Sequence, residues 1–570
     1  MNNQTEKRIC QNCNYNFTIE PDDFLFYEKM KVPAPTFCSE CRRQRRLAFY
    51  NLSNLFHRNC DLCGEKFISV YSPEAPYIVY CTKCWYSEKW DFKDFGIDYD
   101  FSKSFFEQFY ELIHKTPLLG LIVNSNTVTG FPYNNYSTYI KDCYLTFNSD
   151  NSKECAYGSS ITRSLESFSS SMVMDCDTTY DCMCIYKSNR CVGTRGNNRF
   201  CIDCYFVRDC ENCQDCFMCT NLKNKKYYFK NEQYTKEEYQ NILNSCNLSS
   251  YNGYQKTKED ANKFWNTNPP QPSWETMSVN CTGSYIFHSK NCKDCYDVAD
   301  SEDCKFCEML WRKNQKDCYD VSGYGEDMKL IYDSSNIFEH AYNVKFSIAT
   351  GLNVSNIEYC KRIMGGHDLF GCVSARKGEY CIFNKQYNKE EYKELREKII
   401  KHMDDMPYID KKGNVYKYGE FFPIELSPFP YNMTFAQLFN PKTEKEIEEI
   451  GGYYLAENKN EYKITKGGKD IPDNISDIGD DILNEIIGCG NCGRGYRIIE
   501  MELRFLRKMK LPIPRDCPFC RINEKLNLWV DNMHLKDRVC DKCGIDFKTH
   551  WGKDRAPIIY CKECYKKEVY

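Results

Sequence analysis

The chain has 570 residues, of which 42% are hydrophobic and 27% are charged, and its formal net charge is -4. This composition is typical of globular proteins and argues against wholesale disorder, and the charge excludes a chain that is basic throughout. The longest apolar run, from Leu118 to Val123, is far shorter than the ~20 residues of a membrane helix, and the first residues lack the apolar core of a secretion signal. We therefore expect a cytoplasmic protein of about four domains, with no membrane partner.

The 38 cysteines are unusual for such a chain. In a reducing compartment a disulfide framework is not expected, so cysteines serve there as metal ligands or as small buried side chains. Their spacing distinguishes the ends of the chain from the middle. Pairs of the form C-x2-C dominate both ends, and irregularly spaced cysteines fill the region between them.

The first expected domain, residues 1–90, and the last, residues 486–570, each contain four C-x2-C pairs. In both copies 24 residues separate the first two pairs and 17 separate the last two. Two such pairs can gather four sulfurs into a tetrahedron around Zn2+. The pattern predicts tandem zinc-ribbon or treble-clef modules at both termini, with four cysteines per metal and about four Zn2+ per chain. The predicted ligands are Cys10, Cys13, Cys38, Cys41, Cys60, Cys63, Cys81, Cys84, Cys489, Cys492, Cys517, Cys520, Cys540, Cys543, Cys561 and Cys564.

The two copies also indicate how the pairs combine. The gap between the second and third pairs is 18 residues in the first copy and 19 in the second. This insertion lies between the two fingers and inside neither of them. It favours sequential sites, in which the first and second pairs share one metal and the third and fourth share another, over a cross-braced arrangement.

A basic segment follows the second pair of the first module. It predicts a knuckle and a short helix that carries Arg42, Arg43, Arg45 and Arg46. Two interpretations stay open. The helix binds the phosphate backbone of a nucleic acid, as basic helices of zinc fingers do, or the arginines compensate the negative charge of the neighbouring thiolates and remain solvated.

Two related blocks fill the expected domains 100–245 and 246–404. The first domain opens with a helix over 104–115, where Ser104 and Glu107 have the capping-box spacing. An offset of 153 residues aligns the ends of the two blocks, and each closes with a capped helix. The capping residues are Thr235 with Glu238 and Asn388 with Glu391.

Short β-type stretches, polar turns and the dipeptide Asp-Cys alternate within each block. We interpret them as two duplicated, cysteine-rich β-solenoid-like blocks in which cysteine is a small apolar filler. The coil length does not follow cleanly from the spacing. The fold class is thus mainly β with short helices, flanked at both termini by the zinc modules.

The densest cysteine run lies in the first block, at Cys210, Cys213, Cys216 and Cys219. It is open to two interpretations, interior packing or a further metal site. The second block has Gly366 and Leu369 in place of Cys213 and Cys216. A ligand set that both blocks needed would appear in both, which favours packing.

The remaining region, residues 405–485, is expected to be a connector with one helix over 442–450. A second helical pattern covers 480–488. None of the eight histidines lies in a recognised catalytic or metal-binding motif. An enzyme therefore has no positive support in the sequence, although solenoids can carry active sites without a linear motif.

The terminal segments resemble the bacterial probable zinc-ribbon domain. The residues that carry this likeness are Phe26, Tyr27, Lys29, Pro33, Pro35, Cys38, Cys41 and Arg42. The whole chain is similar to large cysteine-rich zinc-ribbon proteins of candidate-phyla-radiation bacteria, through KDCYLTFNSDNSKECAYG, FNKQYNKEEY, EFFPIELSPFPYN and YCKECYKKEVY. The resemblance implies zinc and a cytosolic bacterial setting, and it implies no activity.

Together these features predict a non-enzymatic zinc scaffold that holds a macromolecular partner through its duplicated terminal modules. The partner is a nucleic acid, a ribosome or a protein, and the duplicated ends also suit homo-oligomer formation. Two alternatives stay open: a metal-dependent or solenoid-flank enzyme, and a protein-interaction scaffold that binds no nucleic acid.

Overall fold

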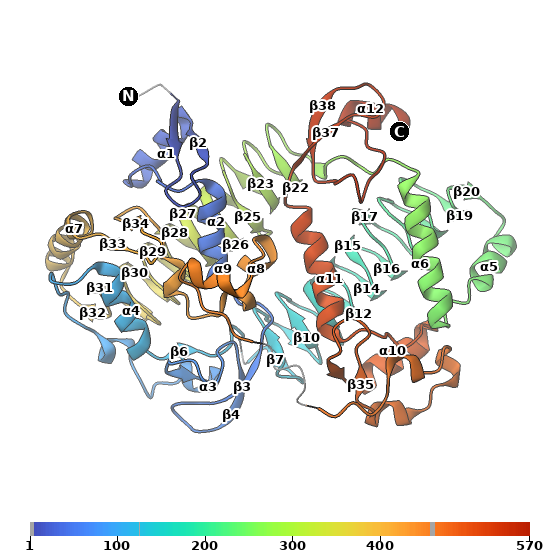
Figure 1. The fold of residues 1–570 in the computed structure, drawn as a ribbon, viewed down its shortest axis with the longest axis horizontal. Coiled ribbons are helices and arrows are strands. Elements are labelled where there is room, and N and C mark those ends of the chain that lie inside the picture. The colour runs from blue at the N-terminus through green and yellow to red at the C-terminus, as the bar shows by residue number, and fades with distance from the viewer. Residues whose placement is uncertain (1–4, 125, 457–461, 570) are drawn as a thin grey trace. The chain divides into compact units, whose positions relative to one another are not determined.

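The computed structural model describes residues 5–124, 126–456 and 462–569, and it is mainly β with large parallel sheets. The chain divides into two compact units, each built from two separate stretches (Figure 1). Unit 1 comprises residues 1–121 and 275–455, and unit 2 comprises residues 122–274 and 456–570. The five consecutive domains that we expected are therefore regrouped. The N-terminal module joins the second block, the C-terminal module joins the first, and the connector is divided between the units.

Each unit contains a coil of parallel strands. The unit 1 coil consists of β21 (Glu275–Thr276), β22 (Gly283–Phe287), β23 (Cys295–Ala299), β24 (Ser301–Glu302), β25 (Glu308–Leu310), β26 (Gln315–Tyr324), β27 (Met328–Ile337), β28 (Ala341–Lys345), β29 (Gly351–Glu358), β30 (Met364–Phe370), β31 (Arg376–Ile382) and β32 (Lys385–Gln386). The unit 2 coil consists of β7 (Val128–Thr129), β8 (Asn134–Asn135), β9 (Ile140–Lys141), β10 (Tyr144–Phe147), β11 (Ala156–Thr162), β12 (Leu165–Phe168), β13 (Ser171–Met174), β14 (Asp177–Tyr180), β15 (Met183–Tyr186), β16 (Asn189–Val192), β17 (Asn198–Arg199), β18 (Gln214–Phe217), β19 (Lys226–Phe229) and β20 (Glu232–Gln233).

The strand register gives the length of one turn. Most parallel pairs join residues 12 apart, such as Tyr144 with Ala156 and Gln214 with Lys226. In unit 1 the spacing grows to 14 between β25 and β26 and to 13 from β26 to β29, and it returns to 12 between β30 and β31. Successive turns thus stack by backbone hydrogen bonds, with one or two residues inserted in some turns.

Corners recur at nearly every third residue of both coils, where non-glycine residues take a φ near +50°. Asp and Asn tolerate this left-handed conformation better than other residues with a side chain. All nine aspartates of the Asp-Cys dipeptides between the modules lie at such corners, with φ between 48° and 55°, and the cysteines that follow them are at most 4% exposed. The dipeptide therefore encodes a corner followed by an inward side chain.

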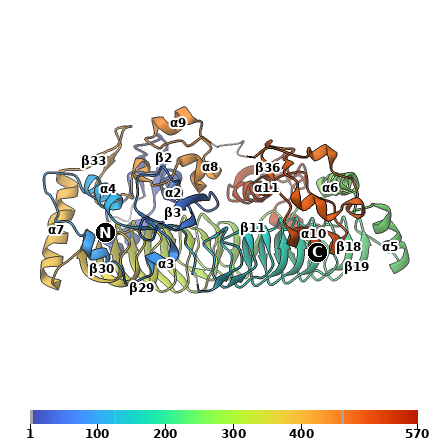
Figure 2. The same cartoon turned by 90° about the horizontal axis from the view of Figure 1, so that it is seen from below.

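Most helices lie along one flank of each coil, and the helix that closes each block lies at the end of its coil (Figure 2). Three of the expected capped helices are confirmed: α4 (Phe105–Lys115), α5 (Lys236–Ser245) and α7 (Lys389–Asp405) begin at their predicted capping boxes. The connector contains α8 (Phe435–Phe439), and the helix expected over 442–450 is α9 (Glu444–Glu449). A sixteen-residue helix that the sequence analysis missed, α6 (Tyr251–Asn266), precedes the unit 1 coil.

The helix expected over 480–488 is wrong. Only a short 3-10 helix forms there, Asp480–Asn484, and residues 487–488 form a strand instead. That strand, β35 (Ile487–Gly488), pairs with β36 (Gly495–Tyr496) in the hairpin that carries Cys489 and Cys492. The apolar pattern did mark buried residues, since Ile482 and Ile487 are buried. The expected α-helix does not form there because the backbone enters the hairpin instead.

Candidate metal centres

The first half of each metal centre is a hairpin turn. The four hairpins are β1 (Glu6–Ile9) with β2 (Asn16–Ile19), β3 (Phe56–Asn59) with β4 (Lys66–Ser69), β35 with β36, and β37 (Lys536–Val539) with β38 (Asp546–Thr549). The residue after the second cysteine has a positive φ in all four, and its N–H donates to the carbonyl of the first cysteine. This residue is Asn14, Gly64, Gly493 or Gly544, types that adopt the left-handed region readily.

The second half of each centre is the start of a helix. Cys38 is the N-cap of α2 (Ser39–Ala48), Cys81 of α3 (Thr82–Trp85) and Cys517 of α11 (Pro518–Asp531), and Cys561 directly precedes α12 (Lys562–Val569). The second cysteine of each pair lies in the first helical turn. Helix N-termini favour negative charge and stabilise thiolates. The sequence thus places each metal centre where a hairpin and a helix meet.

The sulfurs gather in the four sets of four that the sequence predicts, with the ligand atoms of each set within 4.8 Å of one another. The Cys13–Cys38 and Cys492–Cys517 sulfur separations are 3.7 and 3.8 Å. Four sulfurs at ~2.3 Å from one Zn2+ define a tetrahedron with edges of about 3.8 Å. The geometry therefore fits a tetrahedral site of four sulfurs. The expected sequential pairing is confirmed, because every set combines consecutive pairs.

The backbone favours the ionised form of the first cysteine in the second finger of each module. Burial disfavours the Cys60 thiolate, but the backbone N–H groups of Cys81, Cys63 and Leu62 outweigh burial and lower the pKa of Cys60 to about 7. At the equivalent position, the N–H of Cys561 donates to the sulfur of Cys540 at 3.2 Å. Burial opposes ionisation here too, but this N–H group and those of Cys543 and Lys542 lower the pKa of Cys540 to about 6.

Four thiolates close each site. A metal bound by all four cysteines keeps no position for a substrate, so these centres suit a structural ion. Soft thiolates in tetrahedral geometry select Zn2+ or iron. One cysteine of each set is exposed, namely Cys13, Cys63, Cys492 and Cys543.

The arginines of α2 are buried, so the expectation of a solvated basic helix is wrong. Arg42 and Arg46 are 2% and 0% exposed. Arg42 pairs with Asp320 at 2.8 Å, and Arg46 pairs with Asp320 at 3.2 Å and with Asp333 at 3.0 Å. Both carboxylates project from corners of the unit 1 coil.

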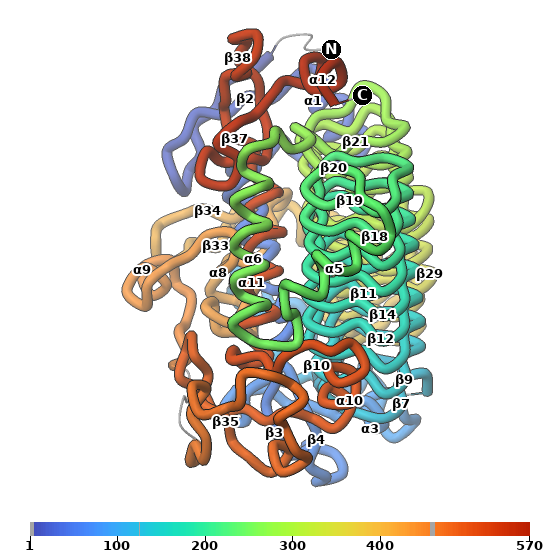
Figure 3. Tube along the Cα trace, turned by 90° about the vertical axis from the view of Figure 1, so that its right-hand side faces the viewer, coloured from blue at the N-terminus to red at the C-terminus, as the bar shows by residue number. Residues whose placement is uncertain are grey.

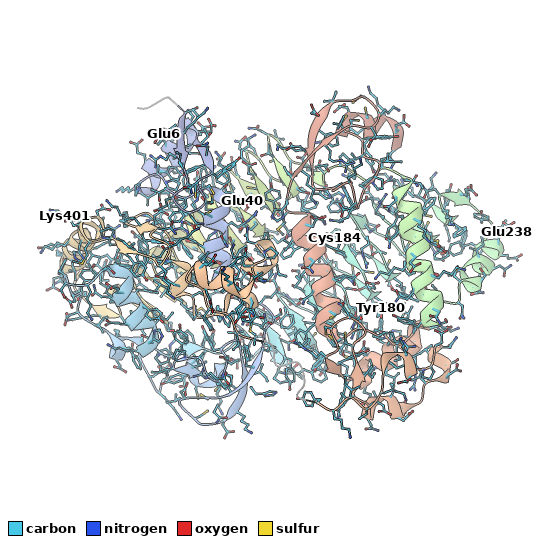
Figure 4. All side chains as sticks on the ribbon, viewed as in Figure 1. Glu6, Glu40, Tyr180, Cys184, Glu238 and Lys401 are labelled. Carbon is cyan, nitrogen blue, oxygen red and sulfur yellow. The ribbon has the colours of Figure 1, made fainter. Side chains whose placement is uncertain are left out.

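The other two arginines of α2 also have partners within unit 1. Arg45 is 2% exposed and pairs with Glu420 at 3.0 Å. Arg43 is 5% exposed and contacts Glu40, which lies at the start of α2 in Figure 4. None of the four side chains presents an exposed basic face to a phosphate backbone, and the charges they compensate are carboxylates of unit 1.

The C-terminal module repeats this docking in unit 2. Arg521 of α11 is 7% exposed and pairs with Glu502 of α10 (Glu500–Met509) at 2.8 Å. Lys525 is 1% exposed and pairs with the corner residue Asp181 at 2.5 Å. Helix α11 lies beside α6 over the coil (Figure 3), and Lys258 of α6 reaches Glu524 of α11 at 3.1 Å. Sequence reasoning missed these partners, and for Asp181, as for Asp320 and Asp333, the corner position was the available signal.

The structure favours packing for Cys210, Cys213, Cys216 and Cys219. The four are at most 1% exposed, and each thiol donates to a backbone carbonyl of the coil at 3.3–3.5 Å. Burial raises the pKa of Cys210 well above its ordinary value, so the neutral thiol is the form held inside. Among the described residues, the sulfur sets close enough to hold a metal are the four terminal ones.

A polar hollow of about 390 Å³ lies on the unit 1 coil. It is lined in part by His340, Ser355, His367 and Glu379. His367 Nδ1 lies 2.8 Å from an Asp368 oxygen, and its Nε2 lies 3.6 Å from Glu379. Both ring nitrogens therefore face carboxylates of the chain itself.

No family model, curated protein or solved structure matches this chain. Among the described residues, no helix combines the length and the apolar character needed to cross a membrane. The site is therefore interpreted from its own geometry.

Proposed function

We propose that the protein is a cytoplasmic, zinc-stabilised and non-enzymatic scaffold that holds a macromolecular partner on the outer faces of two β-solenoid coils. The observation that carries this proposal is the set of four closed four-cysteine centres, each of which joins a hairpin to a helix. In each module the helix of the first finger, α2 or α11, buries its cations on coil carboxylates. The metals thus act as clamps that fix the modules to the coils.

The terminal modules are proposed to be of the bacterial zinc-ribbon type. The turn residues Asn14, Gly64, Gly493 and Gly544 and the helix-capping cysteines support this assignment. A cytoplasmic setting agrees with it, because the ligand thiols must stay reduced to bind a metal.

Elemental analysis of purified protein tests the clamp. We expect about four zinc ions per chain, as four closed sites of four thiolates require. Cys492→Ser removes one ligand of one set and should release one zinc. The matched control Cys219→Ser changes a buried interior thiol and should keep the full complement. Full zinc retention by Cys492→Ser would contradict the assignment of that set.

Nucleic acid is a second candidate partner, through a surface other than the buried arginines of α2. Exposed lysines and partly buried tyrosines alternate at the end of the unit 2 coil, where Lys225 lies over the ring of Tyr228 and Lys226 over that of Tyr227. Such a surface can bind phosphates and stack bases. The exposed lysines are Lys223, Lys225, Lys226 and Lys230.

Salt titrations distinguish the two partners. We expect charge reversal of those four lysines to weaken binding to a fluorescent single-stranded RNA and to flatten its salt dependence. Charge reversal of four exposed lysines on α7 is the matched control and should leave both unchanged: Lys389, Lys393, Lys398 and Lys401. Equally weak RNA binding by the parent protein and both variants would favour the alternative, a scaffold that binds protein and no nucleic acid.

Homo-oligomer formation through the modules stays a prediction. Ile9 and Tyr15 flank the first knuckle and are 67% and 68% exposed, and Val539 and Ile545 occupy the matching positions in the last knuckle at 54% and 59%. Light scattering should show a dimer that becomes monomeric in the double variant I9S/Y15S. A monomeric parent protein would refute this part of the proposal.

A further inference from the structure

The two coils can be compared position by position. The 153-residue offset that aligns their closing segments pairs Lys361 with Arg208 and Arg362 with Asp209. The bridges agree with this alignment, since Lys361 bridges to Val373 and Arg208 bridges to Thr220. Both pairs lie under the second finger of the module that packs on their own coil. Each coil therefore serves as an internal reference for the other.

In unit 2 the cation at this place has a counter-charge and backbone acceptors, although Asp209 Oδ2 is buried without a hydrogen-bond partner among the described residues. Arg208 donates to the carbonyls of Trp265 and Asn268 at 2.8 and 3.0 Å. Asp209 supplies a carboxylate 3.9 Å from Arg208 and accepts from Trp274 Nε1 at 3.1 Å. Arg208 and Asp209 are 3% and 7% exposed.

The second finger of unit 2 also donates a hydrogen bond to the coil near this place. Tyr565 of α12 donates its hydroxyl to the side chain of Asn221 at 2.9 Å, and Asn221 lies one turn after Asp209. In unit 1 the matching residues are Trp85 of α3 and Ser374. Among the described residues, Trp85 Nε1 and Ser374 Oγ are both buried without a hydrogen-bond partner.

The equivalent place in unit 1 holds two cations and no carboxylate. Lys361 and Arg362 are each 5% exposed, and within the described part of the chain neither forms an ion pair. Arg362 donates to the hydroxyl of Tyr86 at 3.3 Å, but its Nε and Nη1 find no acceptor. Its guanidinium lies 5.5 Å from the ring centres of Trp85 and Phe338.

A buried cation without a counter-charge is costly, and ordered water can satisfy its hydrogen bonds but not its charge. Lys361 can avoid the cost of a buried charge by losing a proton, since burial and the neighbouring Arg362 lower its pKa to about 7. Arg362 cannot avoid this cost by losing a proton, because a guanidinium stays protonated in proteins. Stacking on two aromatic rings offsets part of the cost and leaves the N–H groups free.

We propose that unit 1 binds a small inorganic anion, a halide or an oxyanion, beside Arg362, where unit 2 carries the Asp209 carboxylate. The donors assigned to it are Arg362, Ser374 Oγ–H and Trp85 Nε1–H, with Lys361 adding charge. The anion is buried between the second finger and the coil and stabilises their contact. This role is independent of any partner of the scaffold.

Thermal unfolding of the zinc-loaded full-length protein tests the proposal. We expect the melting temperature to rise and saturate with chloride or phosphate at constant ionic strength, and to stay flat with gluconate, a bulkier organic anion. The salt that raises the melting temperature more identifies the bound anion as a halide or as an oxyanion. Arg362→Asp recreates the arrangement of unit 2, with Lys361 beside a carboxylate, and should abolish the anion dependence. Arg163→Asp changes an exposed arginine of unit 2 by the same charge and should retain it.

Two further measurements keep the test decisive if Arg362→Asp does not fold. Trp85→Phe keeps an aromatic side chain and removes the indole N–H donor. The anion concentration at which the melting temperature saturates should therefore rise. A bromide-soaked crystal should give an anomalous peak within hydrogen-bond distance of Arg362. The proposal is overturned by a response equal to that of gluconate, by a saturable response that survives in Arg362→Asp, or, where chloride has the larger effect, by the absence of such a peak.

Discussion

Replacing Arg46 by methionine should detach α2 from the unit 1 coil. The Arg46 side chain is fully buried and contacts three buried carboxylates, those of Asp320, Asp333 and Glu308. Arg46→Met keeps most of the volume and leaves these carboxylates short of positive charge. Removing one partner of such a buried network costs about 3–5 kcal/mol. The exposed pair Arg163–Asp175 supplies the control, since Arg163→Met should cost only about 0–1 kcal/mol.

Hydrogen exchange read by mass spectrometry measures this cost locally. Amides of α2 should lose protection by the stated amount in Arg46→Met, and amides of α11 should not change. Adding Asp333→Asn to Arg46→Met should restore part of the protection, because the uncompensated carboxylate is then removed. A loss in Arg46→Met no greater than in Arg163→Met would refute the view that these ion pairs hold the module on the coil.

Three further predictions address the metals, the carboxylates and the corners. Cys38→Ser should lower zinc content by one ion and expose α2, but not α11, to hydrogen exchange, and protection of α2 equal to the parent's would contradict the clamp. Burial raises the pKa of Glu308, a buried partner of Arg46, to about 7, so its contribution to unit 1 stability is lost as pH rises through 7. Burial opposes ionisation of Glu524 in unit 2, but its charged neighbours outweigh burial and lower the pKa of Glu524 to about 2. The stability that the Glu524 carboxylate contributes to unit 2 should therefore stay constant between pH 8 and pH 5. Hydrogen exchange that changes alike with pH in α2 and in α11 would contradict this assignment. At a coil corner, Asp215→Val should lower the melting temperature through a backbone cost of roughly 1–2 kcal/mol, while Asp215→Gly avoids that cost, and equal melting temperatures would exclude a backbone origin.

The metal ligands could be predicted from the sequence because their geometry is local. A C-x2-C pair and the turn that holds it lie within five residues, and each finger spans fewer than 35 residues. The capping boxes at Ser104, Thr235 and Asn388 were predictable for the same reason, since the capping hydrogen bonds join residues three apart. Local chemistry decides these features whatever the rest of the chain does.

The turn length of the coils was harder to read, although its signal was present. The Asp-Cys dipeptides at Cys204, Cys210 and Cys216 keep a strict multiple of three, as corners at every third residue require. From Cys182 to Cys204 the separation is 22 residues, because one turn has gained a residue. Insertions of this kind shift the phase and hide a 12-residue period from any search for a constant spacing.

The pairing of modules with coils could not be predicted from the sequence. Arg42 meets Asp320 across 278 residues, and Arg521 meets Glu502 across 19 and the coil residue Ser169 across 352. The duplicated ends and duplicated blocks admit either pairing on composition alone. The choice rests on which carboxylates stand at the corners that face each helix, and that depends on the coil register.

The basic helix illustrates why charge in a sequence does not establish exposure. Arg42 and Arg46 are four residues apart and so share one face of α2, the face that the coil covers. Four arginines on a ten-residue helix suggest a phosphate ligand only while their counter-charges are unknown. Here the counter-charges come from aspartates, a residue type that left-handed corners favour for backbone reasons, Asp320 and Asp333 among them. The same residues thus shape the coil and anchor the module, and a sequence rich in corner aspartates can bury a basic helix that would otherwise bind nucleic acid.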